Sequence, residues 1–206
     1  MAGRTPKVTA ETWIDTGRRS LVEEGIGAVK VDRLASRLGV TRGGFYHNFK
    51  DREDFLAQLL AHWEETCRFL PDEPPASRPA EAADWFCNVV DRLIAADGYD
   101  PQFDMAVREW ARSDQRAAWA VERADRMRLA TLQRFFEAVG YNADEAKIRA
   151  RVFYYHQIGY YALGVRESLT ERRRNLNFYM EILSGPGVLA AARASEGKPR
   201  KIRARG

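Results

Sequence analysis

The sequence predicts an all-α protein with two helical domains and a C-terminal tail. Along the 206-residue chain, apolar residues recur at helical spacing, and no stretch shows the alternating pattern of a β-strand. Apolar residues make up 45% of the chain and charged residues 30%, a balance typical of a globular protein. Glycine, proline, aspartate and asparagine interrupt the helical pattern at intervals, so we expect about nine helices.

Three helices follow one another closely at the N-terminal end. Thr9 is placed to cap a first helix, which Gly25 stops. A short second helix covers residues 31–38, and Gly39 supplies the turn after it. Thr41 is then placed to cap a third helix through its hydroxyl. Two short helices joined by a tight turn indicate a helix-turn-helix.

A helix-turn-helix needs a small residue where its two helices cross and an apolar wedge between them. Ala35 supplies the small residue. The wedge is expected to consist of Leu34, Leu38, Val40 and Phe45. We expect Phe45 and Phe49 to lie in the core and not on the surface.

The rest of the chain predicts six longer helices. Asp51 is placed to cap the fourth, which Pro71 ends, and the segment PDEPPASRP follows as a linker. The remaining five, the last capped by Thr170, are expected over residues 80–96, 101–112, 114–139, 144–167 and 170–184. These elements predict a DNA-binding domain over residues 1–52, an effector-binding and dimerisation domain over 53–185, and a basic, flexible tail over 186–206.

Charge is divided unevenly along the chain. Residues 1–52 carry ten basic and six acidic side chains, and residues 185–206 carry six basic and one acidic. Residues 53–184 carry 17 basic and 22 acidic side chains. Basic ends on an acidic body suit a molecule that touches a polyanion with one end only.

Several classes of protein are disfavoured. No apolar run approaches the ~20 residues that span a bilayer, and no signal peptide is evident, so we expect a cytoplasmic protein without a membrane partner. Cys67 and Cys87 are too few for a disulfide framework and are expected to be reduced and buried. The chain has no Gly-rich phosphate loop, no GxSxG motif and no metal-spaced Cys/His set. We therefore expect no catalytic residues, no cofactor, no metal and no enzymatic activity.

The segment VDRLASRLGVTRGGFYHNF, residues 31–49, resembles the TetR family of bacterial regulators. With the EEG that ends the first helix and the KDREDFL that follows, the resemblance covers residues 9 to about 63. Two positions depart from the family pattern: Lys30 stands where a Ser or Thr cap is usual, and Asn48 stands where the family has His. The resemblance implies an omega-shaped homodimer of nine helices with a ligand-responsive C-terminal domain.

In such a protein the third helix enters the major groove of DNA. Arg42 is the candidate for a bidentate contact to guanine, with a phosphate contact as the alternative. Gly43 and Gly44 weaken the helix but let the backbone approach DNA. The complete set of predicted DNA-binding residues is Lys30, Thr41, Arg42, Gly43, Gly44, Tyr46, His47 and Lys50.

A two-fold operator requires a two-fold protein. The helix expected over residues 144–167 is apolar on two faces, so one face is expected to meet a second copy, with a single monomeric core as the alternative. The predicted interface consists of Ile148, Val152, Tyr155, Gly159, Ala162, Leu176, Tyr179 and Leu183.

Aromatic residues between the fourth and eighth helices predict a pocket for a small, largely apolar effector. The predicted lining is Trp63, Trp110, Phe153, His156 and Tyr160, although ordinary core packing explains aromatic stripes as well. The sequence thus predicts a ligand-responsive regulator, most simply a repressor that binds double-stranded, palindromic operator DNA as a homodimer. The alternatives are a helical regulator without a ligand and a helical-bundle enzyme.

Overall fold

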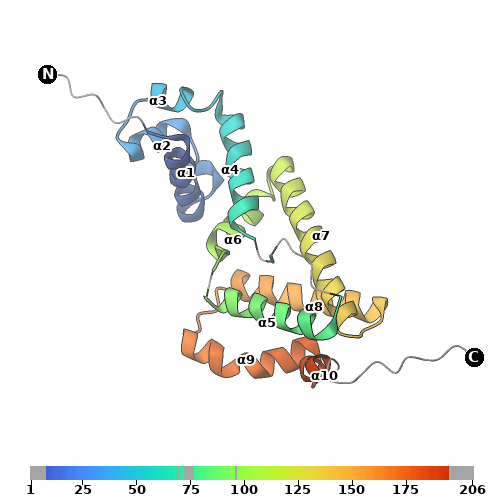
Figure 1. The fold of residues 1–206 in the computed structure, drawn as a ribbon. Helices are drawn as coiled ribbons and strands as arrows, with labels where there is room; N and C mark the ends of the chain where they lie inside the picture. Colours follow the sequence, from blue (N-terminus) through green and yellow to red (C-terminus); the bar gives the residue numbers. More distant parts are fainter. Residues whose placement is uncertain (1–7, 69, 72–76, 96, 195–206) are drawn as a thin grey trace, which may run out of the picture. The chain divides into compact units, whose positions relative to one another are not determined.

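The computed structural model describes residues 8–68, 70, 71, 77–95 and 97–194, and these contain ten α-helices, one 3-10 helix and no strand (Figure 1). The all-α prediction is confirmed, with one helix more than expected. Contacts divide the chain into two compact units. Unit 1 comprises residues 1–68 and 99–124, and unit 2 comprises residues 69–98 and 125–206. The functional domain boundaries expected at residues 52 and 185 stay a prediction.

Unit 1 holds the N-terminal helices and a returning segment of the chain. Thr9 caps the first helix as predicted, since its Oγ1 accepts a hydrogen bond from the amide of Thr12 at 3.3 Å. Asp51 caps the fourth in the same way, through the amide of Asp54 at 2.8 Å. The elements are α1 (Ala10–Glu24), η1 (Ile26–Ala28), α2 (Val31–Leu38), α3 (Arg42–Tyr46), α4 (Arg52–Thr66), α6 (Pro101–Trp110) and the first residues of α7 (Gln115–Ala138).

Two helix ends in unit 1 differ from the sequence prediction. Thr41 has the extended backbone of a capping residue, but its hydroxyl makes no capping bond. Its carbonyl oxygen instead accepts from the amide of Gly44 at 3.0 Å, which leaves the exposed hydroxyl available to other partners. α4 ends at Thr66 and not at Pro71, because Cys67 leaves the helical conformation and its Sγ donates to the carbonyl of Asp100 at 3.5 Å.

A cluster of aromatic rings forms the core beneath α1, α3 and α4. Trp13, Phe45, Phe49 and Phe55 are each at most 2% exposed, and the ring centroids of Phe45 and Phe55 lie 5.4 Å apart. Phe45 and Phe49 are therefore core residues, as predicted. A Cβ on Gly17 would lie 2.5 Å from the Phe55 ring, so α1 and α4 need a glycine where they meet.

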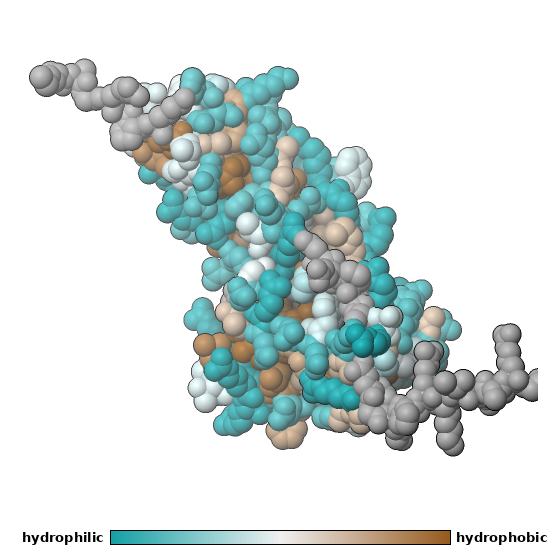
Figure 2. Space-filling model, in the orientation of Figure 1, coloured by the Kyte–Doolittle hydropathy of each residue, from teal (hydrophilic) through white to brown (hydrophobic). Residues whose placement is uncertain are grey.

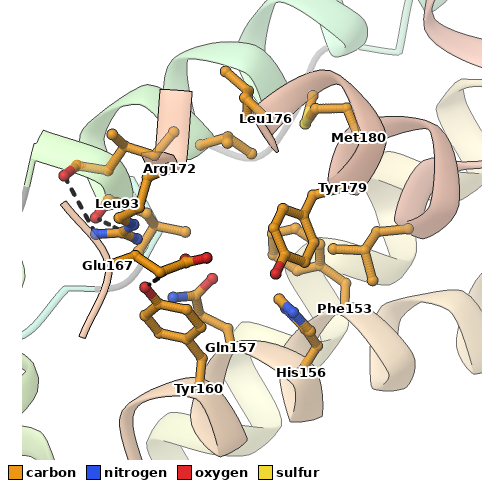
Figure 3. A pocket seen from close by; sticks show the side chains of 13 residues that line it. Leu93, Phe153, His156, Gln157, Tyr160, Glu167, Arg172, Leu176, Tyr179 and Met180 are labelled. Atoms are coloured by element: carbon orange, nitrogen blue, oxygen red, sulfur yellow. Dashed lines mark hydrogen bonds between the residues drawn. The ribbon is translucent and has the colours of Figure 1, made fainter. Parts of the chain in front are cut away.

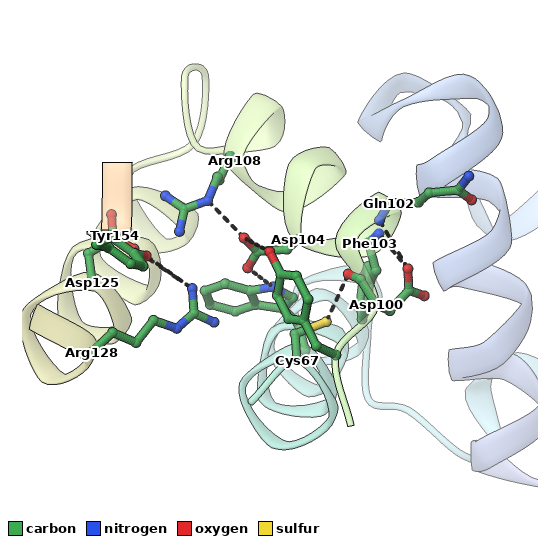
Figure 4. Close-up of polar contacts among 11 residues, drawn as sticks. Cys67, Asp100, Gln102, Phe103, Asp104, Arg108, Asp125, Arg128 and Tyr154 are labelled. Carbon is green, nitrogen blue, oxygen red and sulfur yellow. Dashed lines mark hydrogen bonds and ion pairs between the residues drawn. The ribbon is translucent and has the colours of Figure 1, made fainter. Parts of the chain in front are cut away.

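A buried carboxylate joins α4 and α6 within unit 1 (Figure 4). Asp104 is 0% exposed and accepts hydrogen bonds from three residues that the structure describes. The donors are the indole of Trp63 at 3.0 Å, the hydroxyl of Tyr99 at 3.1 Å and Nε of Arg108 at 2.9 Å. A buried carboxylate with several donors is compatible with a stable core because its lost hydration is replaced.

Unit 2 consists of α5 (Pro79–Ala95), the rest of α7, α8 (Ala143–Ala162), α9 (Leu169–Ser184) and α10 (Val188–Ala194). α8 ends earlier than predicted, and Gly164 with φ of 63° follows it. Ser168, and not Thr170, caps α9: its hydroxyl accepts from the amide of Glu171, whose carboxylate accepts from the amide of Ser168. Residues 188–194, which the sequence assigned to the tail, form α10.

The core of unit 2 is also aromatic. Phe86 of α5 stacks on Phe135 of α7 at 4.1 Å and meets Phe153 of α8 at 5.0 Å. On α10, Ala192 is buried and Arg193 forms an ion pair with Asp84 of α5 at 2.8 Å. α10 is therefore packed against α5.

Polar contacts also tie α7 to α8 within unit 2, as Figure 4 shows. Arg128 is 8% exposed and donates to the hydroxyl of Tyr154 at 3.2 Å. That hydroxyl donates in turn to Asp125 at 2.5 Å. The buried side chains of Arg128 and Tyr154 therefore both have partners.

The face that Figure 2 shows is mostly hydrophilic, with apolar residues in small patches. No helix in the described ranges has the length and apolar character needed to cross a membrane. Cys67 is buried, whereas Cys87 is only half-buried, and neither forms a disulfide.

Candidate nucleic-acid interface and ligand cavity

The α2–α3 turn has the geometry of a helix-turn-helix. Gly39 adopts the left-handed conformation with φ of 65°, and the amide of Val40 donates to the carbonyl of Ala35 at 3.0 Å. Leu34 and Ala35 are buried, as the predicted packing of α2 requires. Leu38 and Val40 are half-buried and complete the wedge at its edge.

Residues predicted to contact DNA form one exposed surface around α3. Seven of the eight are exposed and Gly44 is half-buried; the exposed ones are Lys30, Thr41, Arg42, Gly43, Tyr46, His47 and Lys50. α3 has only five residues, so most of it can lie within one groove. Arg42 and Tyr46 are four residues apart and share one face.

An ion pair holds the side chain that is predicted to read a base. Nε of Arg42 lies 3.0 Å from a carboxylate oxygen of Asp32 on α2. Both side chains are more than half exposed, so this pair contributes little to stability. The pair holds the guanidinium of Arg42 beside α2.

Other basic residues of α2 already have carboxylate partners. Arg33 pairs with Glu24 at 3.1 Å, and Arg37 pairs with Glu23 at 2.9 Å and also with Glu24. By contrast, within the described residues, Lys30 and Lys50 form no ion pair within 4 Å. These two lysines are therefore the better candidates for contacts to phosphate.

Gly43 and Gly44 are not required by the fold. Both lie in the helix without a positive φ, and an added Cβ would meet its nearest neighbour at 3.6 Å in Gly43 and 3.7 Å in Gly44, an ordinary contact. Each glycine costs roughly 1 kcal/mol relative to alanine in a helix. An external reason is therefore needed, and the close approach of another molecule supplies one.

Asn48 is a structural residue that the sequence reading noted only as a departure from the family pattern. Its Nδ2 donates to the carbonyl of Gly44 at 2.8 Å and to that of Val8 at 3.2 Å. The amide thus joins the middle of α3 to Val8, the residue before the cap of α1. A side-chain amide directly after a short helix is the signal that could have indicated this role.

Residues predicted to line the ligand pocket fall into two groups. Trp63 and Trp110 belong to unit 1, where Trp63 is fully buried against Asp104 and Trp110 borders a hollow of about 740 Å³ between α1 and α6. Phe153, His156 and Tyr160 line one cavity in unit 2 (Figure 3). The structure therefore brings three of the five together.

This cavity lies among α5, α8 and α9 and has a volume of about 60 Å³. Apolar side chains form most of its wall, and polar ones gather at one end (Figure 3). Sequence reasoning missed Glu167 and Arg172 as lining residues. The complete lining is Val90, Leu93, Ile94, Phe153, His156, Gln157, Tyr160, Glu167, Arg172, Leu176, Tyr179, Met180 and Leu183.

The two charged groups of the cavity have partners within it. Glu167 accepts a hydrogen bond from Tyr160 at 2.9 Å, and the guanidinium of Arg172 lies 5.2 Å from the centre of the Tyr160 ring. Arg172 also donates to the carbonyls of Leu93 and Ile94 at 3.4 Å. Burial, together with the bond to Glu167, raises the pKa of Tyr160 to about 12. Tyr160 therefore stays a neutral donor at physiological pH.

Two polar groups of the cavity have no partner. Nδ1 of His156 is buried without a hydrogen bond, and burial lowers the pKa of His156 although Glu167 acts in the opposite direction. Gln157 is 8% exposed, and its amide points into the cavity without a hydrogen bond to any residue that the structure describes (Figure 3). Buried polar groups normally have partners, so this end of the cavity is suited to a polar ligand group.

The predicted dimer interface also divides into two groups. Ile148, Val152 and Tyr155 are at least 50% exposed and lie on one face of α8. By contrast, the predicted residues of α9 line the cavity: these are Leu176, Tyr179 and Leu183. Phe178 and Ile182 of α9, which sequence reasoning missed, are more than 70% exposed.

The small residues predicted for the interface lie near the end of α8. Gly159 is half-buried and Ala162 is exposed.

Within the described part of the chain, no group of three or more His, Cys, Asp or Glu side chains could hold a metal ion.

Comparisons with known proteins address the N-terminal segment most directly. Residues 14–59 match the family described as bacterial regulatory proteins, tetR family. The transposon Tn10 TetC protein of Escherichia coli is 35% identical over 51 residues, which are 25% of this chain and 26% of that protein. The match thus spans about a quarter of the curated relative.

The solved structures to which this chain shows a weak similarity include BioQ with its natural double-stranded DNA operator and apo ActR from Streptomyces coelicolor. BioQ has a TM-score of 0.47 at 19% identity, over 89% of this chain and 99% of that one. ActR has a TM-score of 0.35 at 18% identity, over 95% of this chain and 100% of that one.

Proposed function

We propose that the protein is a DNA-binding transcriptional regulator, because residues 14–59 match the family of bacterial regulatory proteins described as tetR family. It acts in the cytoplasm as a repressor: a homodimer binds a palindromic operator, and a small, largely apolar effector releases it. The observation that carries this proposal is the exposed surface of α3, where Arg42 and Tyr46 flank two glycines that the fold does not need.

DNA reading follows from the chemistry of that surface. Arg42 can leave Asp32 for the paired acceptors of guanine, a contact worth about 1–3 kcal/mol of discrimination between bases. Lys30 and Lys50 contact phosphates, which fix the position of the protein on the duplex but carry no sequence information. The exposed hydroxyls of Thr41 and Tyr46 and the ring of His47 supply further contacts to the DNA backbone.

Homodimer formation covers an apolar surface that a monomer would expose to water. Ile148, Val152 and Tyr155 on α8 and Phe178 and Ile182 on α9 are each at least 50% exposed. Large exposed side chains gathered on two helices are typical of interaction surfaces. A dimer built on them presents two copies of α3, which read half-sites about 34–36 Å apart when the operator is a palindrome.

Ligand response is assigned to the cavity among α5, α8 and α9. A ligand changes operator affinity only if it prefers one conformation of the dimer, because binding shifts the population toward the preferred state. The unpartnered groups of His156 and Gln157 support a ligand at this place, since a ligand can supply their hydrogen bonds.

Selection of bound sequences from random DNA tests this function. The purified protein is compared with Arg42→Ala and with the control Arg112→Ala, which removes another exposed arginine, outside α3. We expect the natural protein and the control to enrich the same palindrome, and Arg42→Ala to lose discrimination at one base pair in each half-site. Enrichment of no sequence, with salt-sensitive binding to all DNA, would refute specific reading.

A further inference from the structure

We propose that the cavity among α5, α8 and α9 binds a small, uncharged aliphatic molecule whose polar end carries a hydrogen-bond donor and acceptor side by side, as a primary carboxamide does. This inference names the ligand class for the ligand-responsive part of the proposed function and rests on it. Three features of the cavity lead to it: the size of its apolar part, the unpartnered amide, and the balance of its charges.

The apolar part of the cavity suits a short aliphatic group. Three helices supply its walls: Leu93 and Ile94 from α5, Phe153 from α8, and Leu176 and Met180 from α9. A cavity of about 150 Å³ is known to hold a benzene ring, whereas this one measures about 60 Å³. A branched group of a few carbon atoms is thus a better match than an aromatic ring. Met180 is flexible and allows some adjustment.

The polar end calls for a paired donor and acceptor. Gln157 has an NH₂ donor and a carbonyl acceptor next to each other, and neither is bonded to a described residue although the residue is only 8% exposed. A primary carboxamide presents the complementary pair and can make two parallel hydrogen bonds with this side chain. Nδ1 of His156, one residue away and also unpartnered, provides a third position.

The charges of the cavity argue against an ionised ligand. Glu167 and Arg172 carry opposite charges, and Tyr160 is a partner of both. Its hydroxyl donates to Glu167, and its ring lies against the guanidinium of Arg172. His156 adds no charge at neutral pH because burial lowers its pKa. A carboxylate or an ammonium group would lose its hydration and find no uncompensated opposite charge, which disfavours both.

A set of ligands of similar shape tests the proposal on the full-length protein without DNA. Isobutyramide, isobutyrate and isobutylamine share a branched aliphatic body and differ in the charge and hydrogen bonding of the polar end. Titration at pH 7.5, followed by isothermal calorimetry or by protein NMR, gives the three dissociation constants. We expect saturable binding of isobutyramide and at least about tenfold weaker binding of the two ions.

Variants locate the binding at the proposed amide. Gln157→Met keeps the size of the side chain, removes both hydrogen-bonding groups, and is expected to weaken isobutyramide binding about tenfold. The control Gln115→Met removes an exposed amide at the start of α7 and is expected to leave binding unchanged. Thermal melting of each variant establishes that it is folded. The preference of the natural protein among the three ligands tests the same proposal without any substitution.

Two kinds of result would overturn the inference. Preference for isobutyrate or isobutylamine, equal binding of all three ligands, or unchanged binding in Gln157→Met would refute the ligand class. Binding of none of the three would refute it as well. Operator selection is measured separately, so a protein that reads a palindrome through Arg42 but shows no preference for the amide keeps the proposed DNA function and loses only this inference.

Discussion

Two buried polar side chains, one in each unit, differ in the partners that they have. In unit 1, Asp104 is completely buried and receives three hydrogen bonds from Trp63, Tyr99 and Arg108. In unit 2, Gln157 is nearly as buried and has no partner among the described residues. A buried group with all its partners stabilises the fold, whereas one without partners lowers stability and is best explained by a function. Removal of the two groups should therefore have opposite consequences.

Asp104→Ala gives the largest expected effect. The substitution removes the buried acceptor to which Trp63, Tyr99 and Arg108 donate. We expect the free energy of unfolding to fall by about 3–5 kcal/mol, measured by urea denaturation. Asp91→Ala, at an exposed position of α5, serves as the control and should change it by less than about 0.5 kcal/mol. An equally small effect of Asp104→Ala would show that the hydrogen bonds of this carboxylate do not stabilise the fold.

Gly17→Ala is expected to have the next largest effect. The new Cβ would lie 2.5 Å from the Phe55 ring, in a core where that ring contacts Phe45 and Phe49. Overpacking of this kind lowers the free energy of unfolding by about 1–3 kcal/mol. Chemical denaturation measures the loss, and unchanged stability would show that α1 and α4 can separate at no cost.

Gly43→Ala should have the reverse effect on stability. Its Cβ meets only the Thr41 hydroxyl at 3.6 Å, so we expect the free energy of unfolding to rise by up to about 1 kcal/mol. Affinity for the selected operator should fall by about tenfold if the glycine permits close approach to DNA. A titration of labelled operator at fixed salt measures this change. Unchanged affinity would indicate that DNA does not approach the helix at this position.

Gln157→Leu tests the other side of the comparison. The amide of Gln157 has no hydrogen bond to a described residue, and leucine is similar to glutamine in size. We therefore expect the free energy of unfolding to stay the same or to rise by less than about 1 kcal/mol. The measurement is the same urea denaturation used for Asp104→Ala. A loss of more than about 2 kcal/mol would show that the amide has a structural role and is not held for a ligand.

The smallest expected effect is a change in the pH dependence of stability. Burial lowers the pKa of His156 in the folded protein. As the pH falls through the ordinary histidine pKa of about 6.5, the unfolded chain therefore binds a proton at His156 more readily than the folded protein does. Stability that is present above that pH is therefore lost as the pH falls. Melting temperatures measured between pH 7.5 and 5.5 should decrease less steeply for His156→Gln. Equal slopes would show that His156 is protonated as easily in the folded state.

Sequence alone predicted the region around α3 better than the cavity. Caps at Thr9 and Asp51, the turn at Gly39 and the burial of Phe45 follow from local patterns, and the structure contains each of them. The hydroxyl cap at Thr41 was wrong because the orientation of one exposed side chain is not set by such patterns.

The cavity depends on how three helices are rotated against one another. Neighbouring positions on a helix differ by about 100° around its axis. A small rotation of α9 therefore decides which of its apolar residues face the cavity. In the structure Leu176 and Tyr179 line the cavity, whereas Phe178 and Ile182 are exposed. The spacing of apolar residues along the sequence does not fix this rotation. The capping box was recognisable in advance, since Ser168 and Glu171 have the required spacing.

Helix α10 has a practical consequence for producing shortened versions of the protein. The basic composition of residues 185–206 suggests that everything after Gly185 can be removed, yet Ala192 of α10 is buried and Arg193 bonds to Asp84 of α5. Removal of residues 188–194 would uncover the apolar surface on which α10 lies, and newly exposed apolar surface promotes aggregation. A chain that ends after Ala194 keeps that surface covered and should remain in solution at concentrations where the shorter chain precipitates.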